Sequence, residues 1–181
     1  MHPRMNIAHL APDLYRAVAA LDDRVTTCGL DRRILHLVKL RASQINGCAF
    51  CVDLHVKEAL ADGLDPQMLH LVAVWHESPF FDARDRAALE WTETVTLAAE
   101  TGIPDDAFAL VRTAFSDTEI AQMTVAIGTI NLWNRIAIGS RLQHPVPAAG
   151  ACRRACGGVP GCPGWRPGVR TGPSVSPRDG A

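Results

Sequence analysis

The spacing of apolar residues constrains the fold of this chain more than any other feature. Between residues 12 and 142 they recur at intervals of three and four, and no useful stretch alternates with a period of two. Residues that start helices separate the segments: Pro12, Asp31, Asp65-Pro66, Asp82 and the capping-box sequence 116–119. We therefore predict an all-α fold of about seven helices joined by short turns.

The composition changes abruptly after Gln143. Residues 145–181 contain eight Gly and seven Pro, and they lack Leu, Ile, Met and Phe. Such a segment cannot bury enough apolar surface to offset the entropy lost on ordering. We predict a helical domain over residues 1–144 and a disordered tail, rich in Gly, Pro and Arg, over residues 145–181.

The most reactive side chains are concentrated in residues 43–55. Asn46-Gly47 predicts a break in the chain, and the residues after it have helix-favouring composition. Cys48, Cys51 and His55 then lie near the start of a helix at positions i, i+3 and i+7. At about 100° per residue they share one face, because Cys51 lies about 60° and His55 about 20° from Cys48. This is the geometry that a dithiol redox site needs.

The two cysteines are not equivalent in this arrangement. An ordinary cysteine, with a pKa of about 8.5, is mostly protonated and reacts slowly with peroxides. The partial positive charge of the helix N-terminus favours Cys48 as the more readily ionised thiol. His55 lies four residues after Cys51 and favours Cys51, because the imidazole can accept its proton. The residues alone leave this choice open.

Two other interpretations of the motif compete with a redox site. Cys48, Cys51 and His55 could bind zinc with His36, twelve residues before Cys48, as a fourth ligand. No second Cys/His pair with suitable spacing follows, so we predict no metal site. The two cysteines could also be small buried apolar residues.

Composition and charge limit which binding partners and which cell compartment we expect for this protein. The net charge of −1 provides no electrostatic reason to expect nucleic acid or an anionic membrane as a partner. The first twenty residues contain several charged side chains and no continuous apolar stretch, so no signal peptide is expected. No apolar run approaches the ~20 residues of a membrane span. We expect a cytoplasmic protein whose thiols are kept reduced.

Three blocks of this sequence resemble one protein family. Residues 37–55 closely resemble the core motif of the alkylhydroperoxidase AhpD-like, carboxymuconolactone decarboxylase superfamily. Residues 75–81 with 84–89, and residues 131–138, look like the next two blocks of that family. The resemblance covers about residues 5–144 and leaves out the tail.

The resemblance implies an all-helical fold that assembles into homo-oligomers, either trimers or hexamers, and a thiol-dependent peroxidase activity. In such proteins the second cysteine, here Cys51, attacks the hydroperoxide and the first, here Cys48, resolves the sulfenic acid to a disulfide. His55 would serve as the proton relay. No flavin, nicotinamide or metal motif is present, so an external dithiol or redox protein would supply the electrons. One alternative is a decarboxylase, but the decarboxylase branch of the superfamily works without paired cysteines, so Cys48 and Cys51 argue against it. The other alternative is a non-catalytic protein that uses its thiols or binds zinc.

One position departs from the family pattern. Members usually carry a glutamate in the helix before the motif, and this chain has His36 there. A carboxylate at this position could take a proton from His55, whereas a second imidazole would compete with His55 for protons. We include His36 among the candidate site residues, and its contribution to the relay depends on whether it faces the cysteines.

Overall fold

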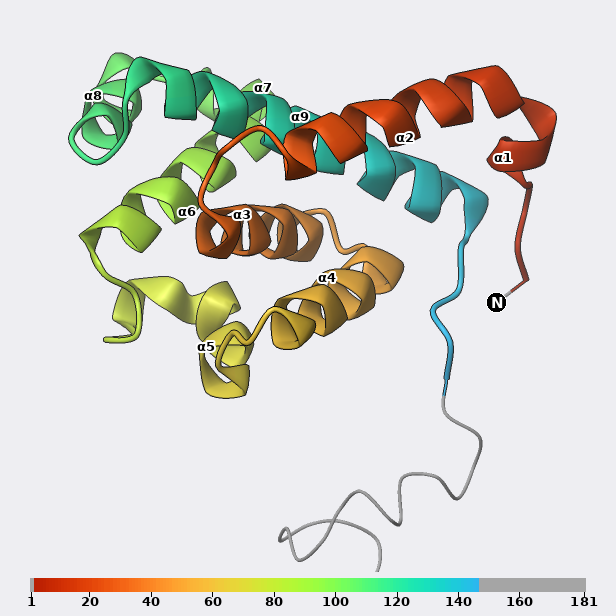
Figure 1. Ribbon diagram of the computed structural model, residues 1–181, viewed down its shortest axis with the longest axis horizontal. Coiled ribbons are helices and arrows are strands. Elements are labelled where there is room, and N and C mark those ends of the chain that lie inside the picture. The colour runs from red at the N-terminus through yellow and green to blue at the C-terminus, as the bar shows by residue number, and fades with distance from the viewer. Residues whose placement is uncertain (1, 147–181) are drawn as a thin grey trace, which may run out of the picture. The chain divides into compact units, whose positions relative to one another are not determined.

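The computed structural model describes residues 2–146, and within them it is built only of helices (Figure 1). The elements are α1 (Ile7–Leu10), α2 (Pro12–Thr26), α3 (Arg32–Ile45), α4 (Ala49–Ala61), α5 (Pro66–Leu71), the 3-10 helix η1 (Val72–Glu77), α6 (Ala83–Thr96), α7 (Ala98–Thr101), α8 (Asp105–Arg112) and α9 (Asp117–Ser140). The all-α prediction is confirmed. The short α1 was not expected, and α7 continues the segment of α6 after a break at Leu97.

The compact helical unit ends at His144. The predicted disorder of the tail concerns residues of which all but Pro145 and Val146 lie outside the described part of the chain, so it stays a prediction. Among the described residues, no helix is both long and apolar enough to cross a membrane.

Capping side chains start the helices where the sequence predicts them. Asp31 accepts hydrogen bonds from the backbone N–H groups of Arg33 (2.8 Å) and Ile34 (3.3 Å) at the start of α3. Ser116 and Glu119 form a reciprocal capping box at the start of α9. These bonds satisfy N–H groups that have no partner within the helix, which fixes where each helix begins.

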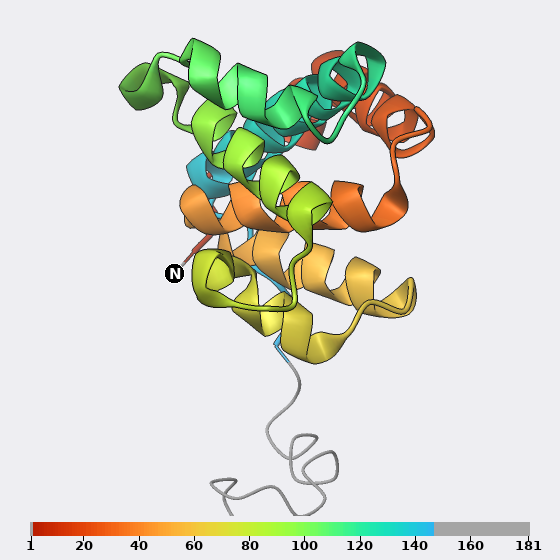
Figure 2. The same ribbon diagram turned by 90° about the vertical axis from the view of Figure 1, so that its left-hand side faces the viewer.

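Helix α3 lies in the middle of the fold, where it packs against α4, α6 and α9 (Figures 1 and 2). Leu37, Val38 and Leu40 are completely buried, although they point in different directions around the helix axis. Burying a side chain of this size stabilises the fold by about 1.5–3 kcal/mol. A helix buried on most sides gives the motif that follows it a rigid support.

A polar network attaches the turn after α3 to α9. The side-chain amide of Asn46 donates to the Oδ1 atoms of Asn131 (2.6 Å) and Asn134 (2.9 Å). Asn134 is fully buried and donates in turn to Ser43 Oγ (3.0 Å). Both asparagines of α9 thus have hydrogen-bond partners. The network fixes the turn that leads into the two cysteines.

Candidate redox site

The two cysteines lie at the N-terminus of α4 and form a disulfide. Cys48 is the N-cap residue, and its Sγ accepts the backbone N–H of Cys51 at 3.3 Å. Gly47 enters this cap with a φ of +68°, a conformation that glycine adopts without strain. Cys48 and Cys51 are 2% and 3% exposed, so solvent barely reaches either sulfur. The predicted placement of the motif at a helix start is confirmed.

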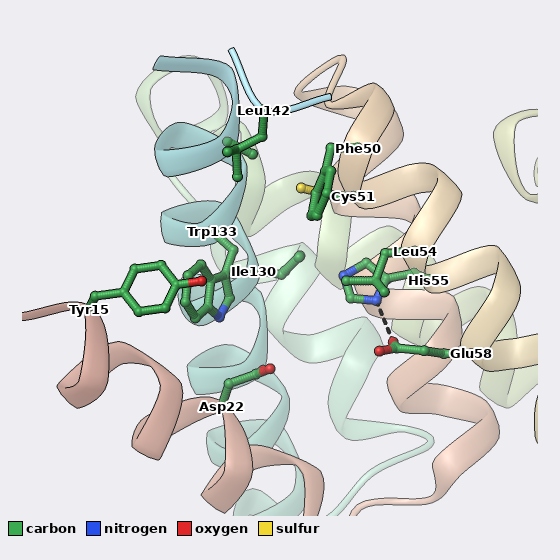
Figure 3. A pocket seen from close by; sticks show the side chains of 11 residues that line it. Tyr15, Asp22, Phe50, Cys51, Leu54, His55, Glu58, Ile130, Trp133 and Leu142 are labelled. Carbon is green, nitrogen blue, oxygen red and sulfur yellow. Dashed lines mark hydrogen bonds and ion pairs between the residues drawn. The ribbon is translucent and has the colours of Figure 1, made fainter. Parts of the chain in front are cut away.

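A cavity of about 260 Å³ lies against Cys51 (Figure 3). Cys51 lines this cavity, and Cys48 is not among its lining residues. The other lining side chains come from α2, α4, α9 and the segment after α9, and they are Tyr15, Asp22, Phe50, Leu54, His55, Glu58, Ile130, Trp133, Ala137 and Leu142. Most of these are apolar or aromatic, whereas Asp22, His55 and Glu58 make one part of the wall polar. A small organic molecule that enters this space meets Cys51 first of the two cysteines.

His55 lines the same cavity and is held by a carboxylate of its own helix. Its Nδ1 lies 2.8 Å from Glu58 Oε2, one helical turn further along α4. The His55 side chain is 6% exposed and that of Glu58 is 47% exposed, so the pair runs from the buried cavity toward solvent. The hydrogen bond with His55 lowers the pKa of Glu58, and the nearby charges of Lys39 and His36 act in the same direction. Glu58 is therefore a carboxylate at neutral pH.

His36 has a different carboxylate partner. Its Nε2 lies 2.6 Å from Oδ2 of Asp62, which also pairs with Arg32. These contacts, that of Arg32 first, lower the pKa of Asp62. Among the hydrogen bonds of the described residues, none joins His36 to His55. His36 lies instead in a polar cleft of about 360 Å³, and Glu58 and Asp22 line both this cleft and the cavity at Cys51.

The four residues that could have bound zinc, Cys48, Cys51, His55 and His36, interact with other groups in this structure. Cys48 and Cys51 are bonded to each other, and the two histidines bind different carboxylates. Within residues 2–146, no three His, Cys, Asp or Glu side chains are grouped so that they could hold a metal ion. The geometry at the motif is that of a disulfide beside a histidine–carboxylate pair.

Comparison with known proteins places the chain in a family. The model of the carboxymuconolactone decarboxylase family matches residues 12–94. The uncharacterized protein YdfG of Bacillus subtilis (strain 168) is 31% identical over 138 residues, which cover 76% of this chain and 94% of the relative. The chain belongs to the carboxymuconolactone decarboxylase family.

Solved structures place this family member close to AhpD-like proteins. A protein of unknown function from Agrobacterium tumefaciens, provisionally assigned as the antioxidant defence protein AhpD, is 56% identical with a TM-score of 0.79; the match covers 80% of this chain and 99% of that one. A peroxidase-related protein from Ralstonia eutropha JMP134 with an alkylhydroperoxidase AhpD core is 24% identical with a TM-score of 0.69; the match covers 77% and 74%. The second likeness supports the fold alone.

Sequence reasoning missed several groups that surround the cysteines of this family member. Glu58 was not singled out, although a carboxylate three residues after a helical histidine lies within reach of it. Tyr15 and Trp133, whose ring centres are 5.2 Å apart, form the wall opposite α4. The sequence pattern of α2 and α9 carries no signal that these two rings face the motif, because helix packing alone brings them there.

Proposed function

We propose that this protein is a thiol-dependent peroxidase that reduces hydroperoxides through the Cys48–Cys51 disulfide. The observation that carries the proposal is the position of Cys51, which lines a cavity together with His55 and is bonded to Cys48. A nucleophile, a resolving thiol and a base are thus on one helix end. Cys51 is the attacking residue, Cys48 the resolving residue and His55 the proton relay. This choice of nucleophile agrees with the family resemblance and with the exposure of Cys51 to the cavity.

The reaction proceeds in three steps: oxidation of Cys51, condensation of its sulfenic acid with Cys48, and reduction of the disulfide. The Cys51 thiolate attacks one oxygen of the hydroperoxide, the O–O bond breaks, and the alkoxide takes a proton from His55 to leave as an alcohol. The Cys48 thiol then attacks the Cys51 sulfenic acid, which forms the disulfide and releases water. Two electrons pass from the thiols to the peroxide. An external dithiol restores both thiols by exchange and becomes a disulfide itself.

The walls of the cavity favour a substrate with an organic group. Phe50, Leu54, Ile130 and Trp133 present apolar surface beside Cys51, and this surface stabilises a hydrocarbon body but contributes nothing to hydrogen peroxide. Organic hydroperoxides are therefore the proposed substrates. We infer that the reductant reaches the disulfide through the same cavity, because Cys51 lines it and both cysteines are otherwise buried.

The assembly and the location are part of this proposal. Leu10 and Leu14 are 69% and 71% exposed on neighbouring helices, and contact with further copies in a trimer or hexamer would cover such side chains. Light scattering in solution measures the number of subunits. A dithiol enzyme that needs continual reduction fits the cytoplasm, where thiols are kept reduced.

A stoichiometric assay tests the activity. The reduced protein, freed of excess reductant, is mixed with cumene hydroperoxide, and we expect one alcohol and one Cys48–Cys51 disulfide for each peroxide consumed. Mass spectrometry measures the disulfide, and added dithiothreitol should make the reaction catalytic. A protein that leaves the hydroperoxide intact, and binds one zinc ion per chain when reduced, would support the metal-binding alternative instead.

A further inference from the structure

The partner of His55 determines which of its two nitrogens can accept a proton. Nδ1 faces the Glu58 carboxylate at 2.8 Å, so in neutral His55 this nitrogen carries the hydrogen and donates it. Figure 3 shows the other ring nitrogen turned toward the cavity that Cys51 lines. The hydrogen bond therefore selects the tautomer whose free lone pair faces the reacting sulfur.

The position that holds the family's glutamate does not supply this carboxylate. His36 occupies it and has Asp62 as its partner at 2.6 Å. The carboxylate of the redox site comes instead from α4 itself, where Glu58 follows His55 by three residues. In this chain the carboxylate that contacts His55 therefore belongs to the motif helix.

We propose that Glu58 is a positioning residue of the redox site, which fixes the tautomer of His55 and stabilises its protonated form. The proposal rests on the peroxidase function proposed above. When His55 takes the Cys51 proton it becomes a cation, and the adjacent anion of Glu58 favours that state until the proton passes to the alkoxide.

The charges around Glu58 are arranged so that it stays ionised. Helix α3 contributes Lys39 and His36, both of which favour the carboxylate. Lys39 is itself paired with Asp22 of α2 at 2.8 Å, which moderates its positive charge. The titratable and charged groups that line the cavity or the cleft with Glu58 are Tyr15, Asp22 and Asp23 from α2, Arg32, His36 and Lys39 from α3, and Cys51, His55 and Asp62 beside it.

Two substitutions of Glu58 separate its effect on the His55 tautomer from the effect of its negative charge. Glu58→Gln keeps an oxygen that can accept the Nδ1 hydrogen but removes the charge, whereas Glu58→Ala removes both. Asp53→Asn is the matched control, because it removes one carboxylate from the same helix that pairs only with Lys57, at 2.6 Å. All variants are made in the full chain.

Nitrogen NMR of the oxidised protein measures the tautomer without any peroxidase reaction. We expect the Nδ1–H form of His55 in the unmodified protein, in Glu58→Gln and in Asp53→Asn, and its loss in Glu58→Ala. In stopped-flow measurements of the first turnover, the rate for Glu58→Gln should decline on the alkaline side about one pH unit earlier than that of the unmodified protein, a tenfold change in proton affinity. The Asp53→Asn profile should superimpose on that of the unmodified protein.

The outcomes distinguish this inference from the proposed function. An unchanged His55 tautomer in Glu58→Ala, or identical pH–rate profiles for Glu58→Gln and the unmodified protein, would overturn the role of Glu58. An unmodified protein that consumes no hydroperoxide would overturn the peroxidase function, whatever the tautomer measurement gives.

Discussion

Glu119 provides a test of how α9, which forms one wall of the cavity, is held to the rest of the fold. Its carboxylate accepts hydrogen bonds from Ser116 N (2.9 Å) and Ser116 Oγ (2.8 Å) and pairs with Arg84 of α6 at 2.5 Å. These contacts, the backbone hydrogen bond of Ser116 first, lower the pKa of Glu119 from 4.5 to about 2. The Arg84 guanidinium also lies 4.1 Å from the ring centre of Phe115, so this ion pair joins α6 to the start of α9.

The pKa sets an upper limit for the stabilisation. A fall from 4.5 to about 2 corresponds to at most about 3.4 kcal/mol. The side chains of Glu119 and Arg84 are 30% and 40% exposed, and solvent screening therefore reduces the contribution to about 1–2 kcal/mol. We expect Glu119→Gln to lower the free energy of unfolding by this amount at pH 7, which corresponds to a fall in Tm of roughly 3–6 °C.

The effect of Glu119→Gln should depend on pH in one direction. Because the folded-state pKa is lowered, the stabilisation is complete above about pH 5 and is lost as the pH falls toward 2. Urea unfolding followed by circular dichroism should thus give a difference at pH 3 that is less than half of that at pH 7. Asp117→Asn is the control, since this exposed residue of the same helical turn pairs only with Arg112, at 3.2 Å, and should change stability by no more than about 0.5 kcal/mol. A difference that is constant from pH 7 to pH 3, or an equal effect of Asp117→Asn, would refute the reasoning.

Three further predictions concern the site and its support. Cys51→Ser should abolish hydroperoxide consumption, whereas Cys48→Ser should complete one turnover and leave a sulfenic acid on Cys51, which dimedone labelling and mass spectrometry detect; equal loss of the first turnover would contradict the assigned roles. His36→Glu should place a second carboxylate against that of Asp62, and we expect a lower Tm with no gain in peroxidase rate, because like charges repel. A faster rate would mean that position 36 reaches the proton relay. Asn134→Ala should destabilise the protein by about 1–3 kcal/mol in chemical denaturation, because it leaves buried partners without hydrogen bonds; unchanged stability would show that water replaces its side chain.

The features that depend on neighbours in the chain could be predicted from the sequence. Asp31 and the pair Ser116 and Glu119 cap helices as their spacing indicates, because capping involves residues within one turn. The position of Cys48 and Cys51 at the start of a helix follows from Asn46-Gly47 and the helix-favouring residues after it. In each case the physical cause is local, so the sequence pattern contains it.

The carboxylate partners of His36 and His55 could not both be predicted from the sequence pattern. Asp62 lies 26 residues from His36, and only the packing of α3 against the end of α4 brings them together. Glu58 could have been predicted, because it lies three residues after His55 on the same helix. The family resemblance instead indicated a carboxylate in the helix before the motif. The aromatic wall formed by Tyr15 and Trp133 depends on two helices that are far apart in the sequence, and helical periodicity identifies a buried face without identifying its neighbour.

The way in which the cavity is enclosed has a consequence for folding. Helices α3 and α4 are adjacent in the chain and can pair early, whereas Tyr15 and Trp133 meet only after a loop of more than a hundred residues has closed. In a refolding chain, the reduced Cys51 should therefore react freely at first with a polyethylene glycol maleimide, a reagent too large for the cavity, and become protected from it when α2 and α9 dock. The rate at which this thiol is shielded would measure the last stage of folding, and the acquisition of peroxidase activity should follow the same time course.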